Sequence, residues 1–378
     1  MTPSARQLRE LREAAGPIQS PEDLLERIAN RAGDPMQGGP LFGKDVRDCL
    51  AAGVGADALG YGRHDGSDAA LIRHVATRLR QIGQTSLSLG RIVEGHMNAL
   101  RLIGLYADPL QKDTWLGAAR SGSIFGVWGA DADSPVTIRK SEDGSWLLSG
   151  GKRFASGLGL LGHAVITARD ARDNIQLVVI DATDASRQNL SSWKTSGMQA
   201  TASGDFTCQD MKLSRADLIG GPGDYLREPF FEGGVWRYAA VQLGGLEALT
   251  DIARRHIVER DLTENREMSR RLADLVMACE TGRLWVEEAA RRTECGSPVT
   301  TSVAYALLAR ETVERCCVEG LAIFDRMIGA ASFFEGHPAE PIRRDLSFFL
   351  RQANLDGKLH AAARVFARNA IDDDRRIS

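Results

Sequence analysis

Two short β-type runs meet at a Gly-Gly pair in the stretch WLLSGGKRFAS, residues Trp146–Ser156. A glycine pair at such a junction is typical of a turn, because glycine adopts positive φ at no steric cost. Along the second run, Phe154 and Ser156 are two residues apart and therefore share one strand face. The stretch predicts two strands joined by a turn, with an aromatic ring and a hydroxyl group on the same side.

Further β-type runs surround this stretch and have no long helix between them. Glu142–Gly144 supplies a hairpin turn, and the run HAVITA does not alternate strictly, which indicates a strand buried on both faces. The spacing predicts an antiparallel barrel or sandwich over residues 121–220. The runs are Ile124–Gly129, Val136–Lys140, Ser145–Leu148, His163–Ala168, Ile175–Ile180 and Gly204–Leu213.

Helical periodicity dominates on both sides of this β zone. Residues 1–120 are predicted to form an N-terminal helical domain, in which Ser67 or Asp68 caps a helix over Asp68–Ile82. Residues 221–378 are predicted to form a C-terminal four-helix bundle, so the fold class is α+β. The bundle's apolar stripes are Leu243–Ile257, Leu272–Leu284, Ala304–Phe324 and a weaker one over Asp356–Asn369.

Composition excludes several classes of function. The 378 residues include 47 Lys plus Arg against 50 Asp plus Glu, a net charge of −3 that gives no reason to expect nucleic acid as a partner. No apolar run approaches the roughly 20 residues of a membrane span, and the charged N-terminus lacks a signal-peptide core, so we expect a cytoplasmic protein. The six cysteines include no Cys-x-x-Cys pair and the seven histidines no i, i+4 pair, so we expect no metal site.

Four segments, taken in order, resemble the acyl-CoA dehydrogenase superfamily over nearly the whole chain. Trp146–Ser156 resembles the strand, turn and flavin-contact strand of that family, and Phe125–Gly129 resembles the strand that carries the flavin edge. Downstream, Ser192–Ser203 resembles a further strand, and Arg344 with Asp345 matches a pair in the family's C-terminal bundle. The resemblance implies an FAD-dependent fold with the flavin between the β domain and the bundle.

The resemblance also implies specific cofactor contacts. Phe154 is expected to stack on the flavin ring, Ser156 to bond flavin N5, and Trp128 to line the other side of the site. Phe125 and Val127 belong to the same flavin-edge strand. A flavin needs such a flat wall with hydrogen-bonding groups near its polar edge. In the family a neighbouring subunit contacts the FAD adenosine, which implies a homodimer or homotetramer.

Two segments expected to reach the partner subunit's FAD depart from the family pattern. One loop keeps Gly329 but has Arg326 in place of glutamine, and Ala330 and Ser332 in place of glycines. Backbone amides and the Arg326 charge still suit a phosphate, although added Cβ atoms narrow the close approach that glycine permits. Arg260 falls where the family places a pyrophosphate-binding arginine, without the usual Phe-Gly after it.

The larger departure concerns the catalytic base. The family removes an α-proton with a glutamate, but Ala353 occupies the usual position and Trp236 the alternative one. Nearby in sequence, Glu232 and Asp356 are candidate replacements, with the alternatives that Glu232 is a surface charge and that Asp356 caps the last helix. His96 is a third candidate, because it lies on an otherwise apolar helix, where a structural role is the alternative.

These residues are compatible with three functions. The first is FAD-dependent α,β-oxidation of an acyl thioester or related small molecule, with an electron-transfer flavoprotein or O₂ as electron acceptor. The second is a flavin-dependent monooxygenase on the same fold, which needs no α-proton base. The third is a degenerate flavin-binding or structural subunit. The loop Ala130–Pro135 argues against a standard CoA thioester, because Asp131 and Asp133 are expected to repel a CoA phosphate.

Overall fold

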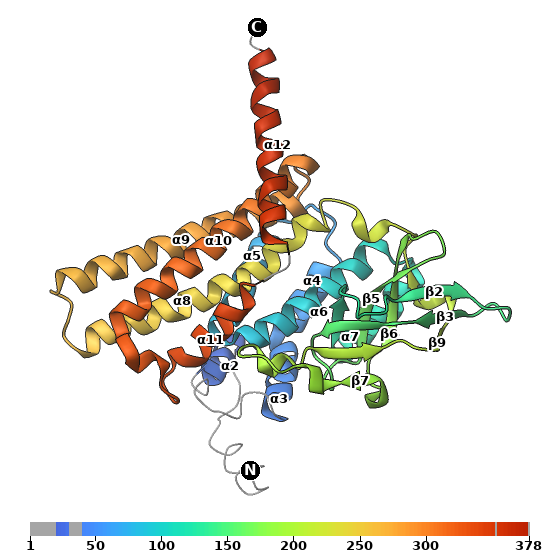
Figure 1. The fold of residues 1–378 in the computed structure, drawn as a ribbon, viewed down its shortest axis with the longest axis horizontal. Coiled ribbons are helices and arrows are strands. Elements are labelled where there is room, and N and C mark those ends of the chain that lie inside the picture. Colours follow the sequence, from blue (N-terminus) through green and yellow to red (C-terminus); the bar gives the residue numbers. More distant parts are fainter. Residues whose placement is uncertain (1–19, 30–39, 352–353, 377–378) are drawn as a thin grey trace, which may run out of the picture.

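The computed structural model describes residues 20–29, 40–351 and 354–376, in which helices, strands and helices follow one another (Figure 1). The N-terminal helices are α2 (Pro21–Ala29), α3 (Pro40–Cys49), α4 (Gly55–Gly62), α5 (Ala69–Thr85), α6 (Leu87–Tyr106) and α7 (Pro109–Arg120). The strands are β1 (Phe125–Trp128), β2 (Thr137–Lys140), β3 (Trp146–Ser149), β4 (Gly151–Ala155), β5 (His163–Arg169), β6 (Ile175–Asp181), β7 (Gln188–Asn189), β8 (Gly204–Thr207), β9 (Met211–Leu213) and β10 (Leu218–Ile219). The C-terminal helices are α8 (Trp236–Glu259), α9 (Arg266–Glu294), α10 (Val299–Ile328), α11 (Ala339–Phe349) and α12 (Leu355–Arg376).

The strands form two sheets. The larger sheet has the order β10-β6-β5-β2-β3-β9 with β1 beside β5, and the smaller has the order β4-β8-β7. The α+β class with a central β region is confirmed, but β1 and β2 pair with β5 in parallel, so the larger sheet is mixed. Residues 142–144 form the expected hairpin turn between β2 and β3, and the five central residues of β5 are buried, as its apolar run predicts.

The helix signals in the N-terminal zone are confirmed at α5. Asp68 is the N-cap residue, and its side chain accepts a hydrogen bond from the backbone N–H of Leu71 at 2.9 Å. This cap satisfies one of the amide groups that a helix N-terminus leaves without an intrahelical partner. Ser86 caps the following helix α6 in the same way. The periodic apolar face of α5 is buried, so local capping and periodicity agree on this element.

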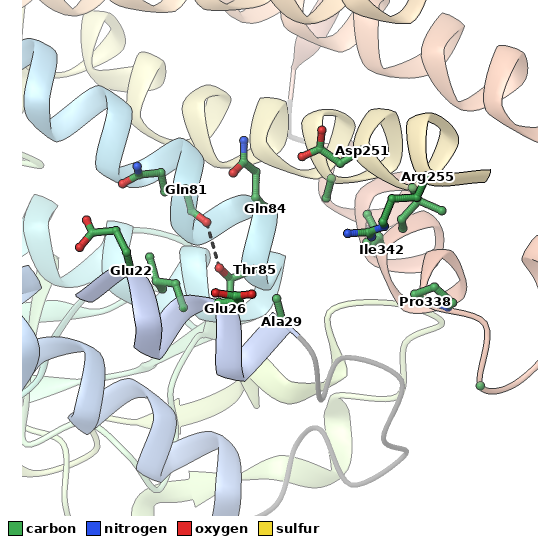
Figure 2. A pocket seen from close by; sticks show the side chains of 14 residues that line it. Glu22, Glu26, Ala29, Gln81, Gln84, Thr85, Asp251, Arg255, Pro338 and Ile342 are labelled. Carbon is green, nitrogen blue, oxygen red and sulfur yellow. Dashed lines mark hydrogen bonds between the residues drawn. The ribbon is translucent and has the colours of Figure 1, made fainter. Parts of the chain in front are cut away.

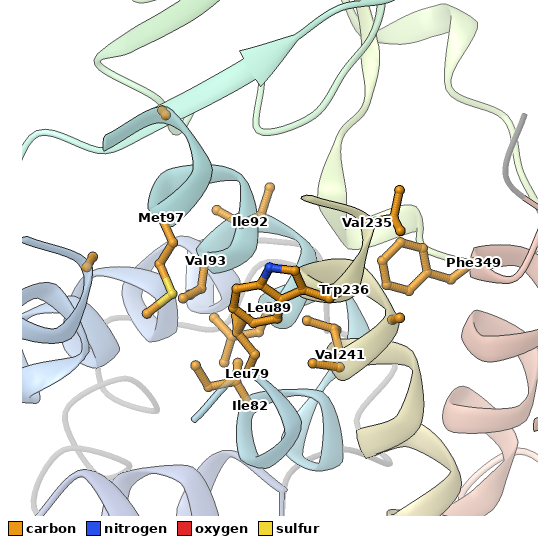
Figure 3. Packing of buried hydrophobic residues seen from close by; sticks show 14 of the residues in the cluster. Leu79, Ile82, Leu89, Ile92, Val93, Met97, Val235, Trp236, Val241 and Phe349 are labelled. Carbon is orange, nitrogen blue, oxygen red and sulfur yellow. The ribbon is translucent and has the colours of Figure 1, made fainter. Parts of the chain in front are cut away.

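The C-terminal helices pack together, and α5 of the N-terminal region joins them. The long helices α8, α9 and α10 pack against one another, but α5 also lies along α8 and α9, whereas much of α12 projects away from the body (Figure 1). A Cβ atom at Gly83 would lie 2.2 Å from the carbonyl oxygen of Val241, and one at Gly244 would lie 2.2 Å from that of Arg80. These glycines let α5 and α8 approach closely, so that Leu79, Ile82 and Val241 share one core (Figure 3).

Two further observations limit the classes of site. Among the helices that the structure describes, none has the length and apolar character needed to cross a bilayer. Within the same described residues, no three potential metal-binding side chains gather in one place.

Candidate functional site

Phe154 in β4 has a backbone conformation that is rare for a residue with a Cβ atom. Its φ is +53°, in the left-handed region, which costs such a residue about 1–2 kcal/mol. The pairing of β4 with β8 shifts register between Lys152 and Ala155, and the Phe154 side chain within this irregularity is 52% exposed. Strain of this kind is concentrated at ligand sites, so an exposed aromatic ring held in it marks a candidate binding surface.

The Phe154 ring lines a hollow of about 250 Å³. The Trp193 ring meets it edge-on with centroids 6.4 Å apart, and the Arg153 guanidinium lies 4.5 Å from the Phe154 centroid. The hollow therefore combines aromatic walls with acidic and basic side chains. Its other lining residues are Ala132, Asp133, Ser192, Ser203 and Asp205.

Three hydroxyl groups form a hydrogen-bonded series beside this hollow, and of the three residues only Ser203 lines it. The Oγ atoms of Ser156 and Ser203 are 2.7 Å apart, Ser203 Oγ is 2.7 Å from Thr201 Oγ1, and Thr201 Oγ1 is 2.7 Å from the Met198 carbonyl oxygen. Ser156 is half-buried, whereas Ser203 and Thr201 are buried. Sequence reasoning selected Ser156 alone. The paired spacing of Thr201 and Ser203 was the available signal for the other two.

The segment before β8 differs from its prediction. Ser192–Ser203 resembles a strand in sequence, but the structure shows a loop with short helical turns, and β8 begins only at Gly204. Met198 has φ +56° and Ala202 has φ +44°, which breaks the extended conformation at both positions. The loop brings Ser203 Oγ to 2.7 Å from Ser156 Oγ and Thr201 Oγ1 to 2.7 Å from Ser203 Oγ.

Asp345 of α11 holds this loop in place. Its carboxylate accepts hydrogen bonds from the Met198 backbone N–H at 2.8 Å and from Ser88 Oγ of α6 at 3.3 Å. A Cβ atom at Gly197 would lie 2.5 Å from the Arg344 carbonyl oxygen, so the loop and α11 are in close contact. Burial raises the pKa of Asp345, and the Met198 hydrogen bond opposes that rise. The arginine–aspartate pair seen in the sequence thus connects the bundle to the β region.

The acidic loop behaves differently from its prediction. Lys152 Nζ is buried and donates to Asp131 at 2.6 Å and to Thr167 Oγ1 at 2.7 Å. Burial lowers the pKa of Lys152, and the hydrogen bond and charge of Asp131 oppose this effect. The Asp131 charge is therefore compensated inside the β region, and it is Asp133 that lines the hollow. Both aspartates were expected to repel a phosphate, but in the structure only Asp133 is placed to do so.

A buried ionic cluster surrounds the start of α8. The fully buried Glu294 carboxylate accepts from Tyr61 Oη at 2.9 Å and from Trp236 Nε1 at 3.4 Å, and it lies 3.1 Å from Arg101 Nη2 and 3.5 Å from Arg237 Nη1. Trp236, at the alternative base position of the resembled family, is thus a buried core residue. Arg237, the next residue of α8, contributes its guanidinium group to the cluster. No sequence signal pointed to this cluster, because its members lie far apart along the chain.

The candidate bases occupy three different environments, and none of them lines the Phe154 hollow. Glu232 lies in η7 (Glu232–Val235), 33% exposed, with Oε2 3.3 Å from Lys358 Nζ of α12. Asp356 is exposed in the first turn of α12 and is not its cap, because the helix begins one residue earlier. Ala353, at the family's usual base position, lies outside the described residues.

His96 is a buried residue that connects α6 to β1. Its Nδ1 accepts a hydrogen bond from the Phe125 backbone N–H at 3.0 Å, so this nitrogen carries no proton. Burial lowers the pKa of His96 to about 4, and the imidazole is neutral at pH 7. The geometry assigns its Nδ1 lone pair to the start of β1.

The His96 environment predicts a pH dependence of stability. Below pH 6.5 the unfolded chain binds a proton at His96 that the folded chain binds only near pH 4, so lowering the pH from 7 to 5 should remove about 2 kcal/mol of stability through this group. His96→Asn keeps an acceptor but does not titrate, so its unfolding free energy should fall by that much less. Urea titrations at both pH values measure the difference, and equal losses in the two proteins would contradict it.

The flavin-edge strand β1 is more buried than its predicted role requires. Phe125 is fully buried and stacks on His163 with centroids 5.0 Å apart, and the Trp128 indole is buried and donates to the Ser156 carbonyl oxygen at 3.1 Å. Val127 between them is half-buried. Phe125 and Trp128 therefore pack in the interior and do not line the Phe154 hollow. The hydrogen bond from the Trp128 indole holds the Ser156 backbone in position.

The predicted phosphate-binding residues lie at helix ends in the C-terminal region. Arg260 follows the end of α8 and is exposed. Arg326 is exposed in the last turn of α10, and Gly329 after it has φ +71° at the start of η8 (Gly329–Phe333). All three are accessible to a ligand or to another chain, and none lines the Phe154 hollow.

A larger cleft of about 580 Å³ lies elsewhere, between α2, α5, α8 and the segment that leads into α11 (Figure 2). Glu22, Glu26 and Asp251 line it together with Arg255. Its amide side chains already have partners, because Gln84 donates to Glu247 at 2.6 Å. No residue predicted as functional from the sequence lies there.

Comparison with known proteins places these features in context. No protein-family model matches the sequence. The mitochondrial short-chain specific acyl-CoA dehydrogenase of Rattus norvegicus is 25% identical over 338 residues, which cover 81% of this chain and 74% of that protein. The acryloyl-CoA reductase (NADH) of Anaerotignum propionicum is 22% identical, with 78% of this chain and 79% of that protein covered. These similarities fit a divergent member of the acyl-CoA dehydrogenase superfamily.

Solved structures show that the superfamily fold extends over the chain. FMN-bound TdsC from Paenibacillus sp. A11-2 superposes with a TM-score of 0.80 at 18% identity, over 92% of this chain and 96% of that one. Butyryl-CoA dehydrogenase from Megasphaera elsdenii superposes with a TM-score of 0.73 at 18% identity, over 93% and 99%. TdsC is described as a dibenzothiophene monooxygenase, so proteins with this fold carry more than one reaction.

Proposed function

We propose that this flavoprotein is a monooxygenase that uses reduced flavin and O₂ to oxidise a small molecule. The supporting observation is the environment of Trp236. At this alternative base position the structure has a fully buried indole bonded to Glu294, and Ala353 occupies the usual base position in the sequence. Oxygenation needs no carboxylate to remove an α-proton, so the replacement of both bases is compatible with it.

The residues at the Phe154 hollow fit FAD, the cofactor of the proposal. Phe154 and Trp193 offer aromatic walls, and the Ser203 hydroxyl in the lining, which donates to Ser156 Oγ, is a hydrogen-bonding group for a polar ring edge. A bound flavin supplies the electron transfer and the reaction with O₂. In this assignment the Phe154 side chain stacks on the flavin ring. The buried side chains of Trp128 and Phe125 pack in the interior and support β4 and β1, and Val127 lies between them in β1.

A second copy of this chain completes the proposed cofactor site. The C-terminal region exposes large apolar side chains on α9, α10 and η8. Their exposure to water is unfavourable, and an identical subunit would bury them. We assign Arg260, Arg326 and Gly329 to the FAD phosphates across that interface, in a homodimer or homotetramer. The exposed apolar residues include Met277, Leu284, Val318, Phe333 and Phe334.

A second candidate is α,β-oxidation of an acyl thioester, with an electron-transfer flavoprotein or O₂ as acceptor. The observation in its favour is Glu232, which lies just before α8 and has a buried Oε2 atom without a hydrogen bond. Its Oε2 atom lies 3.3 Å from Lys358 Nζ of α12, which places an ion pair at this position. The relative from Rattus norvegicus is also an acyl-CoA dehydrogenase.

An experiment on the purified protein separates the two. We expect the protein to bind FAD, Phe154→Ala to weaken that binding about tenfold through the lost aromatic contact, and O₂ to be consumed with dibenzothiophene when a separate flavin reductase supplies reduced flavin. Visible absorbance measures the binding and an oxygen electrode measures the turnover.

Other outcomes point elsewhere. Anaerobic bleaching of the flavin by butyryl-CoA, abolished in Glu232→Gln, would establish the dehydrogenase and contradict the oxygenase. A wild-type protein that takes up no flavin would contradict both and favour a structural subunit.

A further inference from the structure

We propose that a polar subsite between η7, α8 and α10 binds the substrate through a neutral carboxamide group. The assignment to the substrate rests on the proposed function. Among the residues that the structure describes, seven buried side-chain atoms have no hydrogen-bond partner, and four of them belong to this subsite. Folded proteins leave few such atoms, so their concentration in one place indicates a missing polar partner. The four atoms are Glu232 Oε2, Tyr238 Oη, Gln242 Oε1 and Arg310 Nε.

Two of the four residues share one face of α8. Tyr238 and Gln242 are four residues apart in that helix, so their side chains lie one turn apart on the same side. Gln242 is in contact with α10, because Cys317 Sγ lies 3.7 Å from the Gln242 carbonyl oxygen. It is also tied to α11, because its Nε2 donates to the Phe349 carbonyl oxygen at 2.8 Å. The Oε1 atom of the same amide is left without a donor.

The register of α10 against α8 brings Arg310 to the same place. The two helices run in the same direction, since Cys317 contacts Gln242 and a Cβ atom at Gly320 would lie 2.3 Å from Leu246 Cδ1. Arg310 lies about two turns before Cys317 on the same face of α10. It is therefore level with the start of α8 and with η7, which packs against α10.

Electrostatic interactions agree with this register. Burial raises the pKa of Tyr238, and among the charges that oppose this rise, that of Arg310 acts most strongly. Burial lowers the pKa of Arg310, and Tyr238 opposes this effect more strongly than Glu311, whose Oε2 lies 3.2 Å from the guanidinium. The negative charges of Glu232 and Glu94 add to the rise at Tyr238. The phenol and the guanidinium therefore belong to one polar environment.

The four atoms offer both donors and acceptors to a ligand. The Arg310 Nε–H only donates, the oxygens of Gln242 and Glu232 only accept, and the Tyr238 hydroxyl can do either. A carboxamide matches this set, because its carbonyl oxygen accepts and its amino group donates. A ligand with acceptors alone would leave the two carbonyl-type oxygens without a partner, which is unfavourable for a buried group.

The charges around the subsite favour a neutral ligand. Glu232 Oε2 lies 3.3 Å from Lys358 Nζ, and Arg310 pairs with Glu311 and with Glu314. Each formal charge among the four residues thus has a partner of opposite sign. A charged ligand would be buried here without a counterion of its own, which is costly, whereas an amide brings no charge.

The position of the subsite connects it to the substrate. Glu232 precedes Trp236, which occupies the alternative base position of the resembled family, and Lys358 follows Ala353, which occupies the usual one. The Glu232 and Lys358 side chains meet at 3.3 Å, so the segments that follow from both positions converge at this point. A ligand held here lies where the resemblance places the chemistry on the substrate.

The test removes one hydroxyl group with Tyr238→Phe. The lost oxygen has no partner within the protein, so the urea midpoint of the ligand-free variant should be at least as high as that of the wild type. The affinity for acetamide, the smallest probe with the proposed group, should fall about threefold to tenfold. Ligand-observed NMR titrations and urea denaturation give independent readouts.

Matched probes and a matched variant complete the design. Acetone lacks the amino group and acetate carries a charge, so both should bind the wild type at least about threefold more weakly than acetamide. Tyr305→Phe on α10, where the ring stacks on Trp285, should leave the acetamide affinity unchanged. A lower urea midpoint for Tyr238→Phe, or a wild type that does not distinguish the three probes, would overturn the subsite.

Flavin uptake separates the subsite from the proposed function. A protein that takes up FAD but does not prefer acetamide would retain the proposed function and lose the subsite. A protein that prefers acetamide but takes up no FAD would contradict the proposed function and, with it, the assignment of the amide group to the substrate.

Discussion

Replacing Glu294 with glutamine is expected to lower the free energy of unfolding by about 3–5 kcal/mol, the range measured when one partner of a buried ion pair is removed. The Glu294 side chain is 0% exposed, and those of Arg101 and Arg237 are 3% and 5% exposed. The neutral amide leaves the Arg101 guanidinium buried without its compensating charge, whereas Arg237 keeps Glu94, whose Oε1 lies 3.8 Å from Arg237 Nε. Urea denaturation followed by circular dichroism measures the loss.

A control on the same helix separates burial from charge. Glu280 of α9 pairs with Arg283 at the surface, and Glu280→Gln should change stability little, because water already solvates both groups. Equal effects of Glu280→Gln and Glu294→Gln would show that the buried cluster carries no special stability. The double variant Glu294→Gln with Arg101→Gln should recover part of the loss, since it also removes the uncompensated Arg101 charge.

Asp345→Ala is expected to weaken flavin binding at least tenfold and to lower stability by about 1.5–3 kcal/mol, the range for hydrogen bonds to a charged group. The substitution removes the carboxylate that accepts hydrogen bonds from the Met198 backbone N–H and from Ser88 Oγ. The loop that carries Thr201 and Ser203 then loses its anchor on α11. Flavin titration and urea denaturation of the same preparations measure the two effects.

Two further variants, one at Asp345 and one at Arg344, test whether the hydrogen bond to Met198 is responsible for the effect. Asp345→Asn keeps an oxygen that accepts from Met198 and should retain most of the flavin affinity. Arg344→Ala removes a 39% exposed side chain that pairs with Glu340 and whose Nε lies 3.4 Å from Asp345 Oδ1. Because the Met198 hydrogen bond to Asp345 remains, the affinity should stay within about twofold. If Asp345→Ala destabilised the protein while its flavin affinity stayed at the wild-type value, the loop would not depend on this anchor.

The prediction from sequence succeeded where short-range rules act. Asp68 caps α5, residues 142–144 form a turn, and the apolar run in β5 is buried on both sides, because capping, turn chemistry and periodicity depend on neighbours in the chain. The resemblance at Trp146–Ser156 also pointed to the superfamily, which the comparisons support. The roles assigned to Phe154 and Ser156 remain predictions.

The same reasoning failed where the answer depends on distant segments. Ser192–Ser203 resembles a strand, but Asp345 and the close contact at Gly197 impose a loop on it. Asp131 was expected to repel a phosphate, but the buried Lys152 compensates its charge. No periodicity or spacing identifies such partners, because 147 positions separate Met198 from Asp345.

By itself, the sequence determined the elements and the superfamily, since both are written in local patterns and in the order of a few motifs. Only the tertiary structure decided that the β4 irregularity exposes Phe154, that Trp236 is buried against Glu294, and that Ser156, Ser203 and Thr201 form one chain. The physical reason is that charge compensation, backbone strain and hydrogen-bond continuity depend on atoms brought within about 3 Å by folding. Spacing along the chain does not encode those distances.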